Sequence, residues 1–465
     1  MKLTVADDLG YSGSYTKLVK VGSPPGDLGT TIYGGTITGN ETWSVDGSPY
    51  HLQGSVTVAR GATLTIESGT RVEGGGGVQL IVYGTLKATG VTFTWTDGLN
   101  QWTGIKFTGS GSSNSRLENC IIEHASGLFG GLVYDLGIIN IIGSSPTITG
   151  CTIGSSSAAN GFLIRNSSPV ISNNIISGMQ NSGIYLNSYN QYYPYTANQS
   201  FPTVTGNIIS SSQNGIDINE TSGGTYQKNN FSGSTSYGIS YSGFTILDAR
   251  NNNWGDPSGP LDDSDDRTSG GWYNPNGKGG RVSDRVMYDP WLGKPLTVTL
   301  TVQGGGKGTV TSDPAGIATN VSTISTAFGY GDNLHLTAKA DEYHLFSGWS
   351  GGCTTKTGDC AMTLTGDFAV TASFDKDTVH AVRLNRPTPV YYPTLLEAYT
   401  NAVNGDTIQA WAVTYEETLT LNGNKRVTFS GGYDQGYTTV KGRTGLKGKL
   451  TLGNGVSVLE NIVVR

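Results

Sequence analysis

A pattern of apolar and polar positions recurs between residues 137 and 256, with a period of about 22 or 23 residues. Each repeat holds an apolar pair, a turn, a second apolar pair and an asparagine in the same order. Two apolar columns stand two residues apart, and their members are Ile139, Phe162, Ile184, Ile216 and Ile239, then Ile141, Ile164, Leu186, Ile218 and Tyr241. Because side chains alternate along a strand, these columns point inward. Such short strands bury their apolar face only when repeats stack, which predicts a parallel β-solenoid.

One turn position of the repeat carries small polar or thiol side chains. It reads Cys120, Cys151, Asn174, Asn207, Asn229 and Asn252. Asparagine tolerates left-handed backbone, and its amide can hydrogen-bond the same residue in the next coil. The two cysteines fit this column as small buried apolar groups. We therefore predict a ladder of side chains that runs along the stack at a sharp turn.

The repeat resembles that of right-handed parallel β-helix proteins, the pectin-lyase-like superfamily in its broad sense, over residues 30–295. The stretch NNNWGDPSGP, followed by VSDRVMYDPWL, is similar to the terminal segment of bacterial β-helix domains. Its large aromatic residues, Trp254, Trp272, Tyr288 and Trp291, suit a cap over the open end of a stack. Residues 1–29 are expected to form a lead or cap. The predicted class is all-β.

Residues 296–376 change character and read as a compact module of alternating strands. The elements GKGTVTSDPAGI, FSGWSGGC and MTLTGDFAVTASF resemble the divergent B-repeat of bacterial surface proteins. Cys353 and Cys360 bracket a short polar loop, and a disulfide there would staple a domain with a small core. The alternative is two free thiols. A second cysteine pair, which a zinc site would need, is missing from the sequence near this loop.

Residues 377–465 contain the clearest helix signal of the chain. Thr394 is the predicted N-cap with Glu397 in a capping box, and Gly405 ends the helix. Its expected apolar stripe is Leu395, Leu396, Tyr399 and Val403. The strands that follow resemble the first coils of a second β-helix. The last coil is then exposed, continued in a longer protein, or covered by another chain.

Composition supports this picture and narrows the function. Glycine accounts for 69 of 465 residues, charged residues for 14%, and the net charge is −6 with scattered Lys and Arg. These values disfavour nucleic-acid binding, and no apolar run is long enough to span a membrane. The opening MKLTVADDLGY lacks the apolar core of a signal peptide, so the chain is intracellular or has lost a leader. The predicted disulfide favours the second, with an extracellular or cell-surface location.

Outward positions on consecutive coils give the sharpest hypothesis for a site. The predicted outward columns read Asn140, Leu163, Tyr185, Asp217 and Ser240, then Ile142, Arg165, Asn187, Asn219 and Ser242. The alternation thus brings Arg165, Tyr185, Asn187, Asp217 and Asn219 onto one face. An insertion follows Asn187 and carries four further candidates, Tyr189, Tyr192, Tyr193 and Tyr195. Insertions in solenoids often map to the binding face. Tyrosine rings pack on sugar rings while amides and a carboxylate bind hydroxyls. The alternative is a loop packed on the solenoid, with Asp217 a solvated carboxylate.

Two other groups of residues carry side chains that suit a metal site or a catalytic role. The acidic run at Asp262, Asp263, Asp265 and Asp266 offers oxygen ligands for calcium, although the EF-hand order is absent and solvated charge is the alternative. No other cofactor is expected. His124 beside Glu123 is expected to be a hydrogen-bonded structural histidine.

The predicted function is non-catalytic recognition or scaffolding outside the cell, with polysaccharide or a surface glycan as the ligand. The catalytic motifs of polygalacturonases and pectate lyases are missing from the coils. One alternative is a lyase or hydrolase with an atypical site, in which Asp217 and Arg165 would act. A purely structural stalk is another. The sequence leaves the oligomeric state open.

Overall fold

The structure, a computed structural model, divides into two units. It describes residues 29–96, 98, 100–127, 137–187, 199–219, 223–353, 355 and 357–465, together with the backbone of three strands before residue 29. The first unit holds residues 1–295 with 329–331, and the second holds residues 296–328 with 332–465. No helix in this described part is long and apolar enough to cross a membrane.

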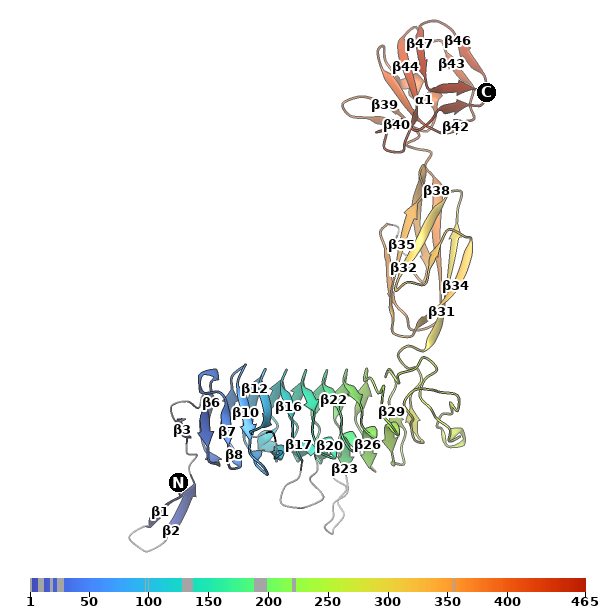
Figure 1. The fold of residues 1–465 in the computed structure, drawn as a ribbon. Helices are drawn as coiled ribbons and strands as arrows, with labels where there is room; N and C mark the ends of the chain where they lie inside the picture. The colour runs from blue at the N-terminus through green and yellow to red at the C-terminus, as the bar shows by residue number, and fades with distance from the viewer. Residues whose placement is uncertain are drawn as a thin grey trace. The chain divides into compact units, whose positions relative to one another are not determined.

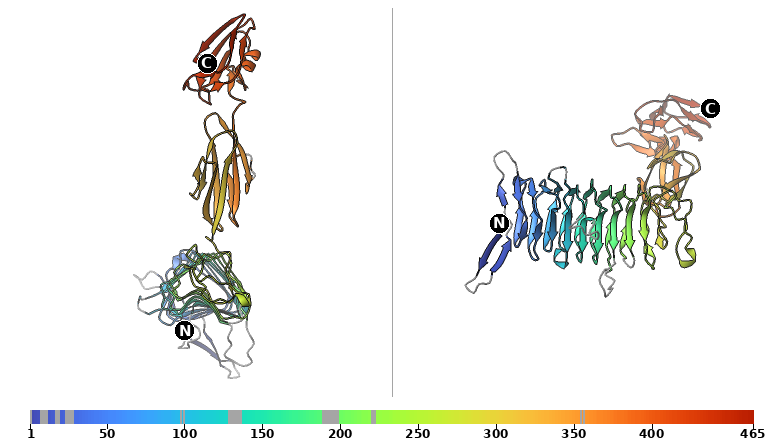
Figure 2. Two further views of the ribbon diagram at one scale, coloured as in Figure 1. Left: turned by 90° about the vertical axis from the view of Figure 1, so that its right-hand side faces the viewer. Right: turned by 60° about the horizontal axis from the view of Figure 1, so that its bottom comes forward.

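The first unit is a solenoid of three long sheets whose strands are supplied in turn by each coil (Figure 1). Seen from its end, the coil encloses a narrow interior (Figure 2). Sheet 1 has nine strands: β3 (Lys20–Gly22), β4 (Thr30–Ile32), β7 (Tyr50–Leu52), β10 (Arg71–Gly74), β13 (Thr92–Trp95), β16 (Ile121–Glu123), β19 (Thr152–Gly154), β22 (Ile175–Ser177) and β25 (Ile208–Ser210). Sheet 2 has nine strands: β5 (Gly35–Ile37), β8 (Val56–Val58), β11 (Gln79–Val82), β14 (Gly104–Thr108), β17 (Gly137–Ile142), β20 (Asn160–Arg165), β23 (Ser182–Asn187), β26 (Asn214–Asn219) and β28 (Tyr237–Tyr241). Sheet 3 has eight strands: β6 (Asn40–Trp43), β9 (Thr63–Ile66), β12 (Thr85–Thr89), β15 (Arg116–Glu118), β18 (Thr147–Thr149), β21 (Val170–Ser172), β24 (Thr203–Thr205) and β27 (Thr225–Gln227).

The predicted inward columns form the core of this solenoid. Phe162, Ile184, Ile216 and Ile239 lie opposite one another on successive strands of sheet 2, and all four are fully buried. Because each strand is too short to bury a face alone, the stability of the stack comes from contacts between neighbouring coils. The prediction of stacked parallel coils is confirmed.

The predicted side-chain ladder is present at the turn between sheets 3 and 1. The Asn174 Nδ2 donates to Asn207 Oδ1 at 3.0 Å, and Asn207 Nδ2 donates to Asn229 Oδ1 at 3.0 Å. The expectation of left-handed backbone at the ladder residues themselves is wrong. The left-handed residue is the one before each ladder position, as at Asn173 and Asn251. This leaves the ladder residue free to point its amide into the stack.

Different structural elements cover the two ends of the solenoid. At the first end, β3 pairs antiparallel with β4, and the short hairpin β1 (Lys2–Ala6) and β2 (Ser12–Thr16) precedes it. At the second end, β29 (Leu247–Asp248) pairs with β30 (Val286–Met287), and the capping segment packs its aromatic side chains on the core. Trp254 and Tyr288 are buried there, while Trp272 and Trp291 are partly buried. Short 3-10 turns are η1 (Val45–Gly47), η2 (Ser110–Ser112) and η3 (Arg267–Ser269).

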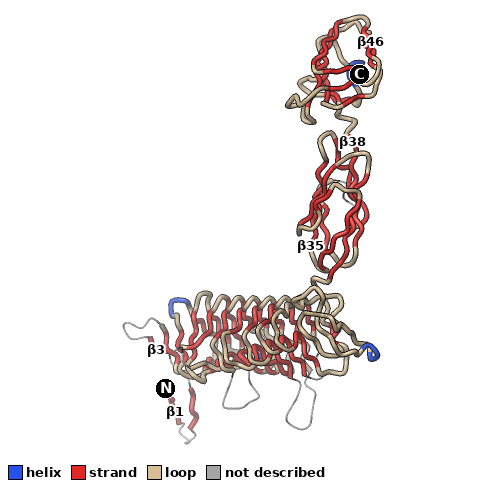
Figure 3. The backbone as a smooth tube through the Cα atoms, turned by 45° about the vertical axis from the view of Figure 1, so that its right-hand side comes forward, coloured by secondary structure: helices blue, strands red, loops and turns tan. Residues whose placement is uncertain are grey.

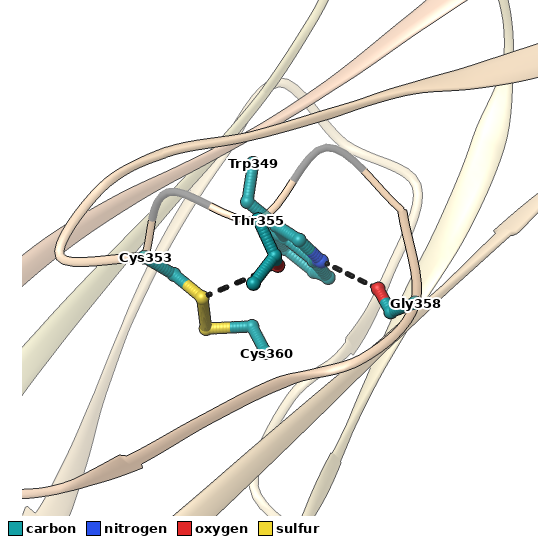
Figure 4. Close-up of a disulfide and its surroundings, with 5 residues drawn as sticks. All are labelled: Trp349, Cys353, Thr355, Gly358 and Cys360. Atoms are coloured by element: carbon teal, nitrogen blue, oxygen red, sulfur yellow. Dashed lines mark hydrogen bonds between the residues drawn. A yellow bond between two sulfur atoms is a disulfide. The ribbon is translucent and has the colours of Figure 1, made fainter.

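The second unit begins with two four-stranded sheets, and strands predominate in it (Figure 3). One sheet contains β31 (Pro295–Gln303), β34 (Thr323–Gly329), β36 (His344–Gly351) and β38 (Phe368–Lys376). The other contains β32 (Gly308–Asp313), β33 (Ala318–Thr319), β35 (Asn333–Ala340) and β37 (Cys360–Thr363). Cys353 and Cys360 are joined by a disulfide, with 6.0 Å between their Cα atoms (Figure 4). Beside it, Trp349 Nε1 donates to the carbonyl of Gly358 at 3.1 Å.

The remainder of the second unit is a shorter stack of mostly parallel strands. One sheet contains β39 (Val382–Leu384), β40 (Val390–Tyr392), β41 (Thr407–Trp411), β44 (Arg426–Tyr433) and β47 (Val456–Glu460). A second contains β42 (Thr414–Tyr415), β45 (Thr444–Leu446) and β48 (Ile462–Val464). In a third, β43 (Leu419–Leu421) pairs with β46 (Leu450–Leu452). Helix α1 (Leu395–Asn401) is capped by Thr394, whose hydroxyl accepts from Glu397 N at 3.1 Å. The expected apolar stripe is wrong at Leu396 and Val403, which are exposed. The helix ends at Asn401, so Val403 lies beyond it.

Candidate functional site

The predicted outward columns stand in register on sheet 2. Tyr185 on β23 lies opposite Asp217 on β26, and Asn187 lies opposite Asn219. Arg165 ends the preceding strand, β20. Neighbouring strands lie about 4.8 Å apart, so these side chains share one patch of the surface.

A cavity of about 410 Å³ is hollowed into this patch. Four of the predicted residues line it, namely Arg165, Tyr185, Asn187 and Asp217. Asn219 stands beside them and accepts a hydrogen bond from Ser242 Oγ at 3.1 Å. The other predicted residues, Tyr189, Tyr192, Tyr193 and Tyr195, lie outside the described residues. We call this cavity and its lining the sheet 2 groove.

Six of the ten residues that line the groove were not among the predicted site residues. The further lining residues are Asn160, Leu163, Asn181, Ser182, Gln213 and Asn214. All but Leu163 are polar, and they come from the start of each strand or from the turn before it. A sequence pattern could have located some of them, because Asn160, Ser182 and Asn214 occupy one register position and each is followed by glycine.

The glycines at this position hold neighbouring coils close together. A β-carbon at Gly161 would lie 2.6 Å from the carbonyl oxygen of Gly183 on the next coil, nearer than such atoms come in proteins. Glycine allows this close approach of two backbones. The polar residue just before each glycine is thereby fixed at the rim of the groove.

Two outward positions differ from expectation because they are buried. Asn140 is fully buried, and its Nδ2 donates to the carbonyl of its own strand at Gly137, at 2.8 Å. Leu163 is 1% exposed. Leu163 therefore adds an apolar side chain to the groove lining, in the same register column as Tyr185 and Asp217.

Asp217 is the one carboxylate among the residues that line the groove. Burial raises its pKa above the usual value, and a hydrogen bond with Ser240 opposes that shift in part. Glycosidases use two positioned carboxyl groups. Among the described lining residues a second carboxylate is absent.

His124 lies in a packed environment. Its ring stacks on Trp95 with centroids 4.3 Å apart, and its Nδ1 is 3.0 Å from Thr94 Oγ1. Glu123 lies beside it at 3.5 Å. These contacts fit the expected structural role.

The acidic run of the capping segment has partners within the protein. Asp263 pairs with Arg281 at 2.6 Å, and Asp265 pairs with Arg267 at 2.6 Å. Of the two buried members, Asp262 accepts from Tyr288 and Asp266 accepts from the backbone N–H of Arg285. Within the described chain, no group of three or more acidic, histidine or cysteine side chains is placed to hold a metal. Calcium binding stays a prediction, which a rise in melting temperature on calcium titration would support.

Asp262 also makes the stability of the capping segment depend on pH. It is 3% exposed, and burial raises its pKa to about 6 from the usual 3.8. The folded state therefore holds a proton that the unfolded chain releases, and stability falls as pH rises through this range. We expect a gain of about 1.3 kcal/mol in unfolding free energy from pH 7 to pH 5. Urea titrations at both pH values would measure it.

The matched variant for this prediction is Asp262→Asn, which has no titrating group at this position. Carboxylates paired with arginine, such as Asp248 and Asp265, have pKa values below their usual range, so they stay charged over this interval. The variant should therefore lose most of the gain on acidification. An equal gain in both proteins would contradict the assignment to Asp262.

Comparison with known proteins agrees with the observed fold. A family model described as right handed beta helix region matches residues 30–191 and 76–254. The predicted handedness and class are thereby confirmed for this part of the chain. No curated protein and no solved structure was found to match the chain.

Proposed function

Because residues 30–254 match the model of the right-handed β-helix family, we propose that the protein binds polysaccharide in the sheet 2 groove without cleaving it. The observation that carries the proposal is the lining of this groove. Five amides and the hydroxyl of Ser182, from three consecutive coils, surround one tyrosine and one carboxylate. Such groups hydrogen-bond sugar hydroxyls while an aromatic ring packs on the sugar face.

The proposed setting is extracellular or at the cell surface, where the protein would also act as a scaffold. The disulfide between Cys353 and Cys360 supports this, because such bonds persist in oxidising compartments. Most of the groove lining lies on the paired strands of the stacked coils, and this rigid support reduces the entropy lost on binding.

A second candidate function is cleavage of the same polymer. The raised pKa of Asp217 favours it, since burial makes this carboxyl group hold a proton more readily than an exposed aspartate does, as a general acid requires. Arg165 would then supply the only cation of the described lining. The lack of a second carboxylate there keeps binding as the preferred function.

The test is a panel of neutral and acidic polysaccharides, scored for retardation in affinity gels and for release of reducing ends or unsaturated sugar. We expect retardation without product. The variant Tyr185→Ala/Asn187→Ala should lower affinity about tenfold or more. The control Tyr83→Ala removes an exposed tyrosine elsewhere and should leave affinity unchanged.

Each other outcome has a definite meaning. Product release that disappears in Asp217→Asn would replace the proposal with the enzymatic function. Binding that survives in the Tyr185→Ala/Asn187→Ala variant would place the ligand elsewhere. Neither binding nor turnover across the panel would leave the structural stalk as the function.

A further inference from the structure

Two cationic side chains lie next to each other on sheet 3, away from the sheet 2 groove. Lys87 on β12 and Arg116 on β15 are direct neighbours in the register, and both are exposed. Their strands lie about 4.8 Å apart, so the two charged side chains project from the sheet next to each other. Like charges at directly opposite positions destabilise a sheet. The arrangement therefore costs stability in the absence of an anion.

The sheet does not neutralise this pair. The neighbours of the two cations in the same column are Thr65 on one side and Thr147 on the other. Glu118 lies two residues beyond Arg116, in register with Thr89. Among the described residues, neither Lys87 nor Arg116 forms an ion pair with this or any other carboxylate.

The two cations line a hollow of about 410 Å³. The other lining residues are Thr63, Thr85, Ser113, Asn114, Ser115 and Thr147. All of them are hydroxyl or amide residues, and none is acidic. Ser113 Oγ accepts from the backbone N–H of Ser145 at 3.0 Å, which leaves its own proton for another acceptor.

We propose that this hollow is a second binding site, in which Lys87 and Arg116 hold one carboxylate or sulfate group of an acidic glycan. Charge-assisted hydrogen bonds from lysine and arginine to such oxyanions are among the stronger polar contacts. The surrounding hydroxyls and amide match the hydroxyls of a sugar ring. A long nucleic acid fits poorly, because the chain carries a net charge of −6. The inference rests on the proposed function for the ligand class and uses a separate surface.

The experiment measures binding of the full chain to polygalacturonate, dextran sulfate and neutral dextran by isothermal titration calorimetry. The variant is Lys87→Gln/Arg116→Gln. The control is Lys228→Gln/Arg250→Gln, which removes one lysine and one arginine elsewhere on the same solenoid and so matches the charge change. We expect the variant to lose about tenfold or more in affinity for one acidic polymer. The control should stay within about twofold.

Further measurements distinguish the loss of this site from the loss of groove binding and from misfolding of the variant. The variant should melt at the same temperature as the parent or higher, because the two like charges are gone. The two acidic polymers distinguish a carboxylate from a sulfate as the bound group. Loss in the hollow variant with unchanged binding in Tyr185→Ala/Asn187→Ala would establish the second site even if the groove proposal fails. Equal losses in variant and control, no loss in the variant, or equal binding of neutral dextran would overturn the inference.

Discussion

Replacing Asn207 with alanine is expected to lower the unfolding free energy of the coils around it by about 4 kcal/mol. The side chain is fully buried in the ladder. Its amide donates to the carbonyl of Ile171 at 2.9 Å and to Asn229 Oδ1 at 3.0 Å, and its Oδ1 accepts from the backbone and the side chain of Asn174. Alanine would remove the side-chain partner of two buried backbone groups, the N–H of Asn174 and the carbonyl of Ile171, and each such loss costs about 1 to 3 kcal/mol. Asn174 Nδ2 would keep the carbonyl of Ile148, and Asn229 Oδ1 would keep the backbone N–H at position 207.

Hydrogen exchange of β24 and β25 is the suitable measurement, because a solenoid can open locally without unfolding throughout. Asn207→Cys provides a graded control. The chain itself places Cys151 at this ladder position, where its Sγ accepts from Cys120 N at 3.4 Å. We expect the cysteine variant to fall between parent and alanine variant. Gln180→Ala changes an exposed amide on a neighbouring coil and should have little effect. Protection equal to the parent in Asn207→Ala would refute the role of the ladder.

The solenoid could be predicted from the sequence because its core uses one side-chain position per strand, repeated in fixed register. Ile139, Phe162 and Ile184 align by simple counting, and the structure pairs them on consecutive strands. The turn geometry could not be read in the same way. Several residue types can adopt left-handed backbone, as Asn173 and Lys228 both do here, so composition alone does not locate that residue.

The candidate site was predictable where the strand pattern can be recognised on both sides of an insertion. Tyr185 and Asp217 were placed together because their two strands alternate in the same way, although the insertion after Asn187 lies between them. Leu163 and Asn140 were predicted on the surface, but burial of an outward position depends on what packs over it, which a strand pattern does not contain.

Lys87 and Arg116 illustrate the same limit for the second site. The coil between them is longer than the regular repeat, so their direct adjacency emerges only from the strand register. Neither residue belongs to a motif, and each alone resembles an ordinary surface cation. Their shared hollow and the lack of a nearby carboxylate among its described lining residues are properties of the folded surface.

The capping segment shows that the end of a solenoid needs a large side chain as well as paired strands. Trp254 is fully buried and packs on Phe231 with ring centroids 5.1 Å apart. Its ring also covers Gly238 in β28, where a β-carbon would come within 3.0 Å of the indole. Trp254→Ala should therefore leave a cavity beneath the cap and cost about 4 kcal/mol. It should also expose the apolar end of the stack and promote association through strand edges.

Trp254→Phe separates the packing of the ring from its polar group. Within the described chain the indole Nε1 is buried and has no hydrogen-bond partner. Phenylalanine keeps an aromatic ring and removes this unsatisfied donor, so the lost contacts are partly offset and we expect a cost of about 1 kcal/mol. Hydrogen exchange of β28 would measure both variants, and size-exclusion chromatography would detect association. Equal protection of the β28 amides in the two variants would show that the aromatic ring does not close the solenoid. The backbone bridges of the capping segment, such as the one between Ile239 and Val282, would then be sufficient.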